Sequence, residues 1–270
     1  MASSTTPIIP DLQGKRVLIT GGSAGIGKAA AFALDANGCS VAVLGRRIER
    51  LDSVAKQLKH GVSIVGDLTK VGDMKRAVQE AIEKLGGLDI IVNSGGASTD
   101  EMWGADEAAF ISALKLHVTG NLTLIRAAEE ELIKNKGAVV NISSVISVMP
   151  GHKPMSAYGA AKAAQDKLTQ DLAFEFAPKG VRINSILPAT IETEVFDTVL
   201  TMTGKSKEAM LAGLAPLHAM GRVGQPEEVA APIVFLASNS ASFITGVNLR
   251  VDGGATLGFW FNQSNFLELK

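Results

Sequence analysis

The chain has 270 residues, of which 46% are hydrophobic and 5% aromatic, with a formal net charge of −1. This length fits one doubly wound α/β domain whose core is filled mainly by Ala, Val, Ile and Leu. The balance of 26 basic and 27 acidic residues excludes a general attraction to nucleic acid or to an anionic membrane. We therefore expect a single domain, residues 1–270, that acts on a small molecule.

The first residues and the cysteine content bear on location. Residues 1–6 have neither an apolar signal core nor a basic amphipathic pattern, and the lone Cys39 cannot form an intrachain disulfide. The longest apolar runs are far shorter than the roughly 20 residues that cross a bilayer. These features predict a cytoplasmic protein without a transmembrane span.

Short β-branched runs alternate with helical stretches along the chain, which is typical of βαβ units. The expected strands are 16–20, 40–44, 61–65, 88–93, 138–142, 181–187 and 247–251. The expected helices are 25–37, 48–58, 71–85, 106–134, 156–178 and a last one that Pro226 opens in its first turn. Connections of this length permit parallel crossovers, so the predicted fold class is α/β, a Rossmann-type doubly wound parallel β-sheet of about seven strands.

Three segments of the single domain are expected to have different roles. The core is expected at about residues 12–254, a variable and helical substrate lid at about 190–216, and a tail at 255–270. Residues 1–13 and 262–270 are expected to be loose ends. The aromatic Phe259-Trp260-Phe261 is expected to pack near the active site, against a neighbouring subunit or on its own core.

A glycine-rich turn follows the first expected strand and precedes an Ala-rich helix. It reads Thr20-Gly21-Gly22-Ser23-Ala24-Gly25-Ile26-Gly27. Glycines let the backbone approach a pyrophosphate, and the helix N-terminus offers free N–H groups and a positive dipole end. The pattern predicts dinucleotide binding through Gly21, Ser23, Gly25, Ile26 and Gly27.

The end of the second strand indicates which dinucleotide binds. An NAD-selective domain commonly has an acidic residue there, but this chain has Arg46 and Arg47. Guanidinium groups suit a phosphate dianion, so these arginines are expected to pair with the 2′-phosphate of NADP. The alternative is a pair of solvated arginines, in which case NAD(H) remains possible.

Tyr158 and Lys162 stand four residues apart at the start of an expected helix, so the phenol and the ammonium share one helical face. Tyr158 is also the only tyrosine in the chain. With the glycine turn upstream, the sequence resembles the short-chain dehydrogenase/reductase family, in particular its compact single-domain members, from about Leu12 to Gly254.

Further segments match that family in order. They are Asp67-Leu68-Thr69, Asn93-Ser94-Gly95-Gly96, Asn141-Ile142-Ser143-Ser144, Arg182-Ile183-Asn184-Ser185, and Pro188 with Ile191 and Thr193. The resemblance implies that Asp67 and Leu68 bind the adenine side of the cofactor and that Asn93 and Gly95 also contact it. It implies that Pro188, Ile191 and Thr193 cover the nicotinamide end.

The resemblance also implies a mechanism. Ser144 orients the substrate oxygen, Tyr158 exchanges its proton, and Lys162 holds the nicotinamide ribose and lowers the tyrosine pKa. Hydride moves between NADP(H) and a carbonyl or secondary alcohol, and no metal takes part. A homotetramer, or else a homodimer, is implied, with the helices at 106–134 and 156–178 paired across an interface.

Two departures from the family pattern leave alternatives open. His117 stands where the family has an asparagine, so it either holds a proton-relaying water, adding a titration near neutrality, or is a core histidine. The distance from Ser144 to Tyr158 is one residue longer than usual, so Ser143 is a possible substitute for Ser144.

The substrate is expected to be a moderately apolar small molecule, because Val145, Met149 and Met155 flank the expected site, as do Ser147, His152 and, beyond strand four, Trp103. Lys153 is the one nearby cation. The leading function is an NADP-dependent carbonyl reductase or alcohol dehydrogenase. The alternative is an NADP(H)-binding sensor or scaffold that keeps the fold without turnover.

Overall fold

The structure is a computed structural model that describes residues 8–96, 104, 106–150, 155–204 and 206–258. Seven parallel strands form one sheet in the order β3-β2-β1-β4-β5-β6-β7. The strands are β1 Arg16–Thr20, β2 Ser40–Gly45, β3 Gly61–Val65, β4 Ile90–Asn93, β5 Ala138–Ile142, β6 Arg182–Pro188 and β7 Asn248–Val251. The predicted α/β sheet and its seven strands are confirmed, with strand ends shifted by two residues at most.

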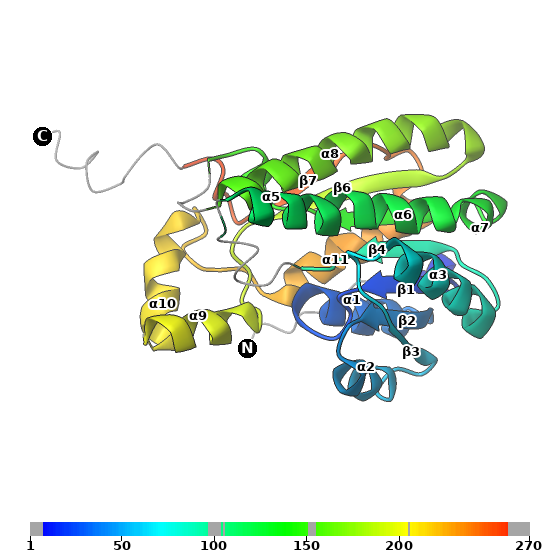
Figure 1. Cartoon of the computed structure of the whole chain (residues 1–270), viewed down its shortest axis with the longest axis horizontal. Coiled ribbons are helices and arrows are strands. Elements are labelled where there is room, and N and C mark those ends of the chain that lie inside the picture. The colour runs from blue at the N-terminus through cyan, green and yellow to red at the C-terminus, as the bar shows by residue number, and fades with distance from the viewer. Residues whose placement is uncertain (1–7, 97–103, 105, 151–154, 205, 259–270) are drawn as a thin grey trace, which may run out of the picture.

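Helices cover both faces of the sheet (Figure 1). They are α1 Gly25–Ala36, α2 Ile48–Ala55, α3 Val71–Leu85, α5 Glu107–Leu114, α6 Gly120–Ala127, α7 Glu129–Lys134, α8 Ser156–Phe176, α9 Val195–Thr203, α10 Lys207–Leu214 and α11 Pro226–Ala237. Short turns are η1 Pro10–Leu12, η3 Val145–Ser147, η4 Ala177–Lys179, η5 Ala215–Leu217 and η6 Asn239–Ala241, and η2 Lys115–Thr119 is a π-turn.

Alternate side chains of each central strand enter two separate cores. In β1, Val17 and Ile19 pack with α1, α2 and α11, whereas Leu18 packs with α3, α6, α7 and α8. Because both faces are covered, the strands are almost continuously apolar, as parallel sheets require. At about 25 cal/mol per Å² of buried apolar surface, each fully buried Leu or Ile stabilises the fold by roughly 1.5–3 kcal/mol.

The predicted helix 106–134 is interrupted. It consists of α5, the π-turn η2, α6 and α7. Gly120 lies so close to the backbone of Leu68 that an added Cβ would be 2.6 Å from the Leu68 carbonyl oxygen. Residues 107–127 are also the one helix among the described residues that is long and apolar enough to cross a membrane, by length and composition only. Here α5 packs on α8 and α6 packs on α3.

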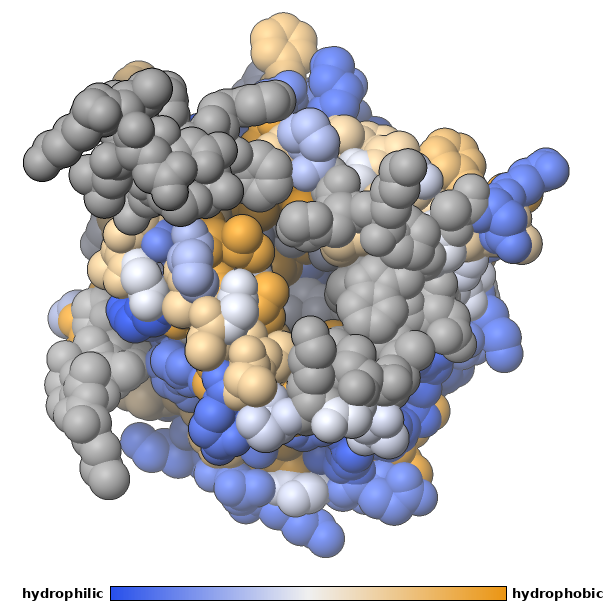
Figure 2. All heavy atoms as spheres, turned by 90° about the vertical axis from the view of Figure 1, so that its left-hand side faces the viewer, coloured by the Kyte–Doolittle hydropathy of each residue, from blue (hydrophilic) through white to orange (hydrophobic). Residues whose placement is uncertain are grey.

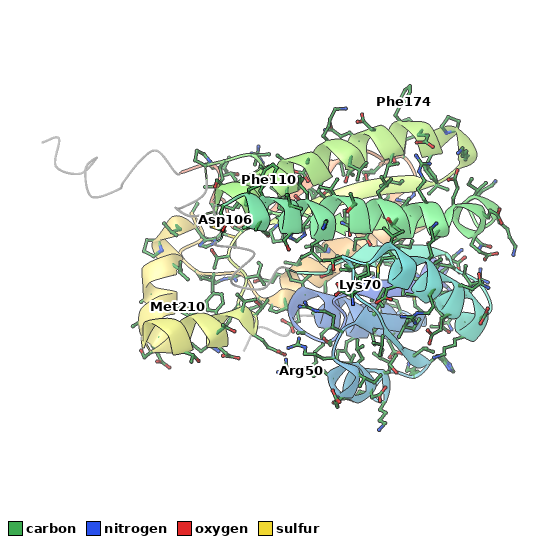
Figure 3. All side chains as sticks on the ribbon, in the orientation of Figure 1. Arg50, Lys70, Asp106, Phe110, Phe174 and Met210 are labelled. Atoms are coloured by element: carbon green, nitrogen blue, oxygen red, sulfur yellow. The ribbon has the colours of Figure 1, made fainter. Side chains whose placement is uncertain are left out.

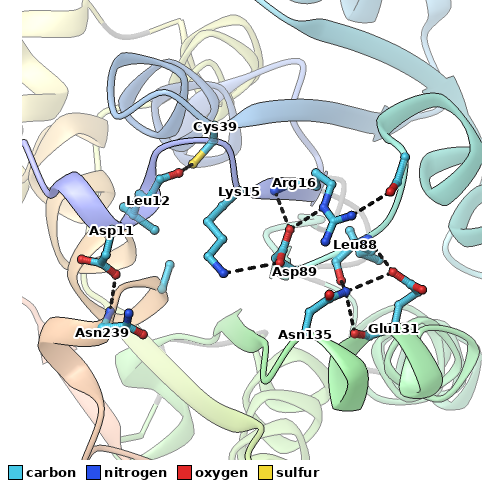
Figure 4. Close-up of polar contacts among 12 residues, drawn as sticks. Asp11, Leu12, Lys15, Arg16, Cys39, Leu88, Asp89, Glu131, Asn135 and Asn239 are labelled. Atoms are coloured by element: carbon cyan, nitrogen blue, oxygen red, sulfur yellow. Dashed lines mark hydrogen bonds and ion pairs between the residues drawn. The ribbon is translucent and has the colours of Figure 1, made fainter.

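The expectation that residues 1–13 are a loose end is wrong for the described part. Leu12 is 1% exposed, the Cys39 thiol donates to its carbonyl at 3.4 Å, and the Asn239 backbone N–H donates to Asp11 at 2.7 Å (Figure 4). Close by, Asp89 accepts from the side chain and the backbone N–H of Arg16 at 2.6 and 2.9 Å. These contacts fasten the end of the sheet opposite to the glycine turn.

Helices α9 and α10 form a pair at one end of the molecule (Figure 1). They lie within the helical segment predicted as a lid at about residues 190–216, and Ser206 caps α10 by accepting from the Ala209 N–H. The expected contacts of Trp103, His152, Lys153 and the tail 259–261 lie outside the described residues.

Candidate active site

Nearly all the predicted site residues lie at one edge of the sheet, where the strands have their carboxyl ends. Strand order reverses between β1 and β4, which are neighbours although two strands separate them in the chain. Open α/β sheets bind ligands in the crevice at such a reversal. The segments after β1, β2, β3, β4, β5 and β6 all begin at this edge.

The glycine turn after β1 has the geometry of an anion site. Gly21 and Gly25 have φ of +66° and +50°, and a Cβ on Gly21 would lie 2.5 Å from the Ser94 carbonyl oxygen. A Cβ on Gly27 would likewise lie 2.5 Å from the Gly21 carbonyl oxygen. Helix α1 starts at Gly25 without a side-chain cap, so its first N–H groups remain available to a pyrophosphate. The partly exposed Ser23 and Ile26 lie in the same turn.

The segment after β6 crosses this turn. Thr193 packs against Gly25, where an added Cβ would be 3.0 Å from the Thr193 methyl group. Ile191 is 8% exposed and pairs with Gly224 in an isolated parallel bridge. Pro188, the last residue of β6, starts the segment that carries both. The structure thus brings together the two stretches expected to enclose the cofactor.

Arg46 and Arg47 lie exposed at the end of β2, and neither forms an ion pair with a described residue. Arg46 lies near Asp67. Burial alone would raise the pKa of Asp67, but hydrogen bonds from Thr69 and the charge of Arg46 outweigh burial, so the pKa lies below its usual value. Two guanidinium groups at this corner fit a 2′-phosphate. Arg50, one helical turn further, is instead paired with Glu194 at 2.6 Å.

Three predicted cofactor contacts lie deeper in the structure. The Leu68 side chain packs on Gly95, where a Cβ would be 2.1 Å from its Cδ1, and the Gly95 N–H donates to the Thr20 hydroxyl at 2.8 Å. The Asn93 side-chain amide donates to Asn141 Oδ1 at 2.8 Å. Its side chain therefore links β4 to β5 and does not reach into the crevice.

Tyr158, Lys162 and Ser144 form one cluster. Tyr158 is partly exposed in the first turn of α8, and the Lys162 ammonium lies 5.6 Å from the centre of its ring. Lys162 is 3% exposed and donates to the Ile142 carbonyl at 2.8 Å and to Gln165 Oε1 at 2.9 Å. An ammonium has three donors, so one remains for a further partner.

The pKa of Tyr158 does not follow the direction that the resemblance implied. Burial raises it to about 12, and a hydrogen bond with Ser144 offsets only part of that rise. Lys162 does not lower it here, because its ammonium is turned to Ile142 and Gln165 and burial lowers its own pKa to about 7. Positive charge near the phenol must therefore increase before Tyr158 can act as a base.

His117 lies in the π-turn η2, is 1% exposed, and stands edge-on to the Tyr158 ring with centres 5.5 Å apart. Its Nε2 is buried without a hydrogen-bond partner among the described residues. Burial, and secondarily the charge of Lys162, lowers its pKa well below 6.5. The titration near neutrality that the sequence suggested is therefore absent, and His117 is neutral at pH 7.

The two candidate serines point in different directions. Ser144 hydrogen-bonds with Tyr158, and its hydroxyl also accepts from the Ile146 N–H at 3.2 Å. Ser143 donates to the Lys162 backbone carbonyl at 3.4 Å. Ser144 is thus the serine beside the tyrosine. Sequence reasoning missed Gln165 and Asp166 beside Lys162, although Asp166 continues the spacing of four from Tyr158.

A cavity of about 410 Å³ opens beyond β6 and β7. Residues 189–191, 218–224 and 250–254 contribute to its walls, and none of the four catalytic candidates lines it. Figure 2 shows that this end of the molecule is hollowed, with apolar surface inside the hollow. Within the described residues no group of three or more His, Cys, Asp or Glu could hold a metal ion.

Comparison with known proteins adds independent findings. Residues 21–256 match a family model described as enoyl-(acyl carrier protein) reductase. The chain is 36% identical over 248 residues to L-fucose dehydrogenase of Bos taurus, covering 91% of each chain. It is 34% identical over 251 residues to 2-(S)-hydroxypropyl-CoM dehydrogenase 3 of Xanthobacter autotrophicus, covering 91% of this chain and 98% of that one.

A solved structure from Brucella melitensis 16M, titled ribose-5-phosphate isomerase, has a similar fold. It aligns with a TM-score of 0.83 and 31% identity, covering 93% of this chain and 95% of that chain. The shared architecture extends over almost the whole molecule, and the two relatives described above are both named as dehydrogenases.

Proposed function

We propose that this chain, which belongs to the short-chain dehydrogenase/reductase family, is an NADP(H)-dependent enzyme that interconverts a carbonyl compound and a secondary alcohol. Its membership makes it an oxidoreductase acting on a small molecule. The observation that carries the finer proposal is the cluster of Tyr158, Ser144 and Lys162 at the edge of the sheet that bears the glycine turn.

Tyr158 is the group that moves the proton at the substrate oxygen. Bound NADP(H) supplies or accepts the hydride. The Ser144 hydroxyl, already within hydrogen-bond reach of the phenol, holds the same oxygen and stabilises its developing charge. In the reducing direction a phenol with a pKa of about 12 is ready to donate. In the oxidising direction it must first lose its proton, which additional positive charge near the phenol would favour.

NADP(H) is the proposed cofactor because Arg46 and Arg47 are exposed at the end of β2, form no ion pair with a described residue, and would suit a 2′-phosphate there. A phosphate dianion there accepts charge-assisted hydrogen bonds, which are roughly twice as strong as neutral ones. The uncapped start of α1 and the close backbone approaches at Gly21 and Gly27 suit the pyrophosphate.

The proposed substrate is a small hydroxylated or carbonyl compound without a phosphate. The relatives are named for L-fucose and for a 2-hydroxypropyl group, both of which carry a hydroxyl on a secondary carbon. We also propose a cytoplasmic homotetramer. Phe110 and Ile111 on α5 and Phe174 on α8 are 40%, 43% and 86% exposed (Figure 3). Contact between subunits would remove such apolar side chains from water, which stabilises an oligomer.

The first experiment is a fluorescence titration with NADPH and NADH, followed by turnover assays with ketones, aldehydes, sugars and secondary alcohols. NADPH should bind more tightly, and Tyr158→Phe should keep NADPH binding within about 3-fold but lose turnover by about 10²-fold or more. Full turnover by Tyr158→Phe would exclude the proposed proton transfer. Tight binding by the wild type with no turnover across the panel would favour a nucleotide sensor.

The arginines are tested by Arg46→Ala. The loss of one charge-assisted contact should weaken NADPH binding by roughly 10-fold, which corresponds to about 1.4 kcal/mol. NADH lacks the phosphate, so its binding should change by less than about 2-fold. Lys56→Ala, an exposed cation beyond the end of α2, serves as control for the general loss of positive charge. Equal weakening for both nucleotides would remove Arg46 from the phosphate site.

A further inference from the structure

A buried carboxylate, Asp166, lies one helical turn beyond Lys162 on α8. Asp166 is 5% exposed and Lys162 is 3% exposed. Side chains four residues apart in a helix are neighbours on one face, so Tyr158, Lys162 and Asp166 form a row. Asp166 Oδ2 has no hydrogen-bond partner among the described residues. A buried carboxylate in this position needs compensation from its surroundings.

Three serine hydroxyls from three segments surround this carboxylate. Ser185 on β6 donates to Asp166 Oδ1 at 3.2 Å. The hydroxyls of Ser143, directly after β5, and of Ser147 in η3 also favour its ionised form. Each has one proton, which it otherwise donates to a backbone carbonyl, that of Lys162 for Ser143 and that of Ser144 for Ser147. Burial raises the pKa of Asp166 above its usual value, and the hydrogen bonds of these hydroxyls and the charge of Lys162 offset part of that rise in favour of the ionised form. The hydroxyls come from the end of β5, from η3 and from β6, all of which lie beside α8, the helix that carries Tyr158 and Lys162.

Lys162 depends on this surrounding charge. The ammonium is buried, and its hydrogen-bond acceptors among the described residues, the Ile142 carbonyl and Gln165 Oε1, are both neutral. Its titratable neighbours are Tyr158 and Asp166 on its own helix and His117 on η2, and Asp166 is the only carboxyl group among these three. The groups that β5 and η3 present are a carbonyl and hydroxyls, which do not titrate.

We propose that Asp166 is the counter-charge that keeps Lys162 as an ammonium, and that the hydroxyls of Ser143, Ser147 and Ser185 keep Asp166 ionised. Asp166 is thus a positioning residue that acts through Lys162 without touching the reacting atoms. The inference rests on the proposed function for its catalytic meaning. Its physical content, the charge state of Lys162, is independent of turnover.

The pKa of Lys162 makes the effect large at physiological pH. Since burial lowers that pKa to about 7, a nearby charge decides how far Lys162 is protonated in neutral solution. At the spacing of neighbours on one helix face, about 5–6 Å between Cβ atoms, a full charge at an effective dielectric constant of about 20 shifts a pKa by one unit or more. Loss of Asp166 would therefore leave Lys162 mostly neutral at pH 7, without the charge that holds a ribose hydroxyl and favours the tyrosinate.

The test measures Lys162 directly. In full-length protein labelled with ¹³C-lysine, the Lys162 Cε resonance, identified by its loss in Lys162→Met, is titrated by NMR in the wild type and in Asp166→Asn. The amide keeps the shape of the carboxylate and removes its charge, so the pKa of Lys162 should fall by about one unit or more. An unchanged pKa would overturn the proposal.

A matched control variant and a second measurement distinguish the loss of the Asp166 charge from a general disturbance of the fold. Asp35→Asn alters another buried carboxylate, on α1, which accepts from the Lys59 N–H at 2.7 Å and lies outside the cluster, so it should leave the Lys162 titration unchanged. NADPH binding should weaken as the pH rises and Lys162 loses its charge. In Asp166→Asn the midpoint of this loss should lie at a lower pH than in the wild type, by the same amount as the pKa of Lys162. Binding curves that coincide would contradict the proposal.

One measurement needs no substitution at all. In wild-type protein labelled with ¹³C-aspartate, the Asp166 Cγ shift at pH 7 should be that of a carboxylate. A protonated carboxyl group would overturn the proposal even if Asp166→Asn did not fold. Failure of the proposed enzyme would appear differently, as wild-type protein without turnover, and would leave these titrations to decide the role of Asp166.

Discussion

His117 shows how one residue departs from its family without leaving the site. It occupies the position of the family's asparagine beside Tyr158, and its buried Nε2 has no hydrogen-bond partner among the described residues. An unpaired buried acceptor or donor costs about 1–3 kcal/mol, so a bound water or substrate group is expected to satisfy it. A neutral imidazole can then do what a carboxamide does, because both offer hydrogen bonds without a charge.

At the residue scale we predict that His117→Asn keeps turnover within about 3-fold, whereas His117→Leu lowers kcat by about 10-fold or more. The Michaelis constant for NADPH should change little in either variant. Because the pKa of His117 already lies well below 6.5, neither variant should remove a limb of the pH profile between pH 6.5 and 8. A fully active His117→Leu enzyme would make His117 a packing residue.

Residue spacing predicted the main site but not its support. The glycine turn and the spacing from Tyr158 to Lys162 reflect local geometry, so they can be recognised in the sequence. Gln165 and Asp166 could not be assigned in that way, because their roles depend on Ile142 and Ser185, which reach α8 only through the sheet. The inward side chain of Asn93 has a similar origin, since its partner is on β5.

At the scale of elements, one ion pair connects the two sides of the crevice. Arg50 on α2 and Glu194, directly before α9, form a 2.6 Å ion pair across 144 residues of chain. Thr193, next to Glu194, packs on Gly25 of the phosphate-binding turn. The pair thus links the start of the lid to the helix that follows Arg46 and Arg47. Figure 3 shows Arg50 on the same side of the molecule as α9.

We predict that Glu194→Gln speeds the dissociation of NADPH by about 2–5-fold and changes its association little. Both partners are about half exposed, and such pairs contribute only about 0.2–1 kcal/mol. Stopped-flow displacement of NADPH measures the rate directly. Lys167→Gln, which breaks a more exposed ion pair with Asp171 on α8, is the control and should leave the rate unchanged. Equal rates in all three proteins would show that the pair does not retain the cofactor.

Element boundaries were predictable where the pattern is local. Every strand was located because the parallel sheet needs apolar runs of about this length. The interruption of helix 106–134 was not predictable, because it accompanies a close contact between Gly120 and Leu68, more than 50 residues earlier. The attachment of Leu12 was missed for the same reason, since Cys39 and Asn239 complete it from a distance.

At the scale of the whole molecule, the two ends of the sheet differ in purpose. At the carboxyl end, His117 Nε2 has no hydrogen-bond partner within the described part of the chain. At the amino end, Asp89 is 5% exposed and contacts Arg16 and Lys15. Burial alone would raise the pKa of Asp89, but hydrogen bonds from Arg16 and the charges of both cations lower it below 3.8. The ionised carboxylate therefore stabilises the fold.

We predict that Asp89→Asn lowers the free energy of unfolding by about 2–3 kcal/mol at pH 7, because hydrogen bonds to a buried charged group contribute about 1.5–3 kcal/mol. The depressed pKa fixes the pH dependence: the stabilisation is complete above the unfolded value of about 3.9 and is lost as pH falls through the lower folded value. Urea unfolding at pH 7 and in steps down to pH 3 should show the wild-type advantage shrink only at the acidic end. Asp171→Asn, at an exposed pair, should cost less than about 1 kcal/mol at every pH. If Asp89→Asn were as stable as the wild type at pH 7, the amino end of the sheet would be held by its apolar core alone.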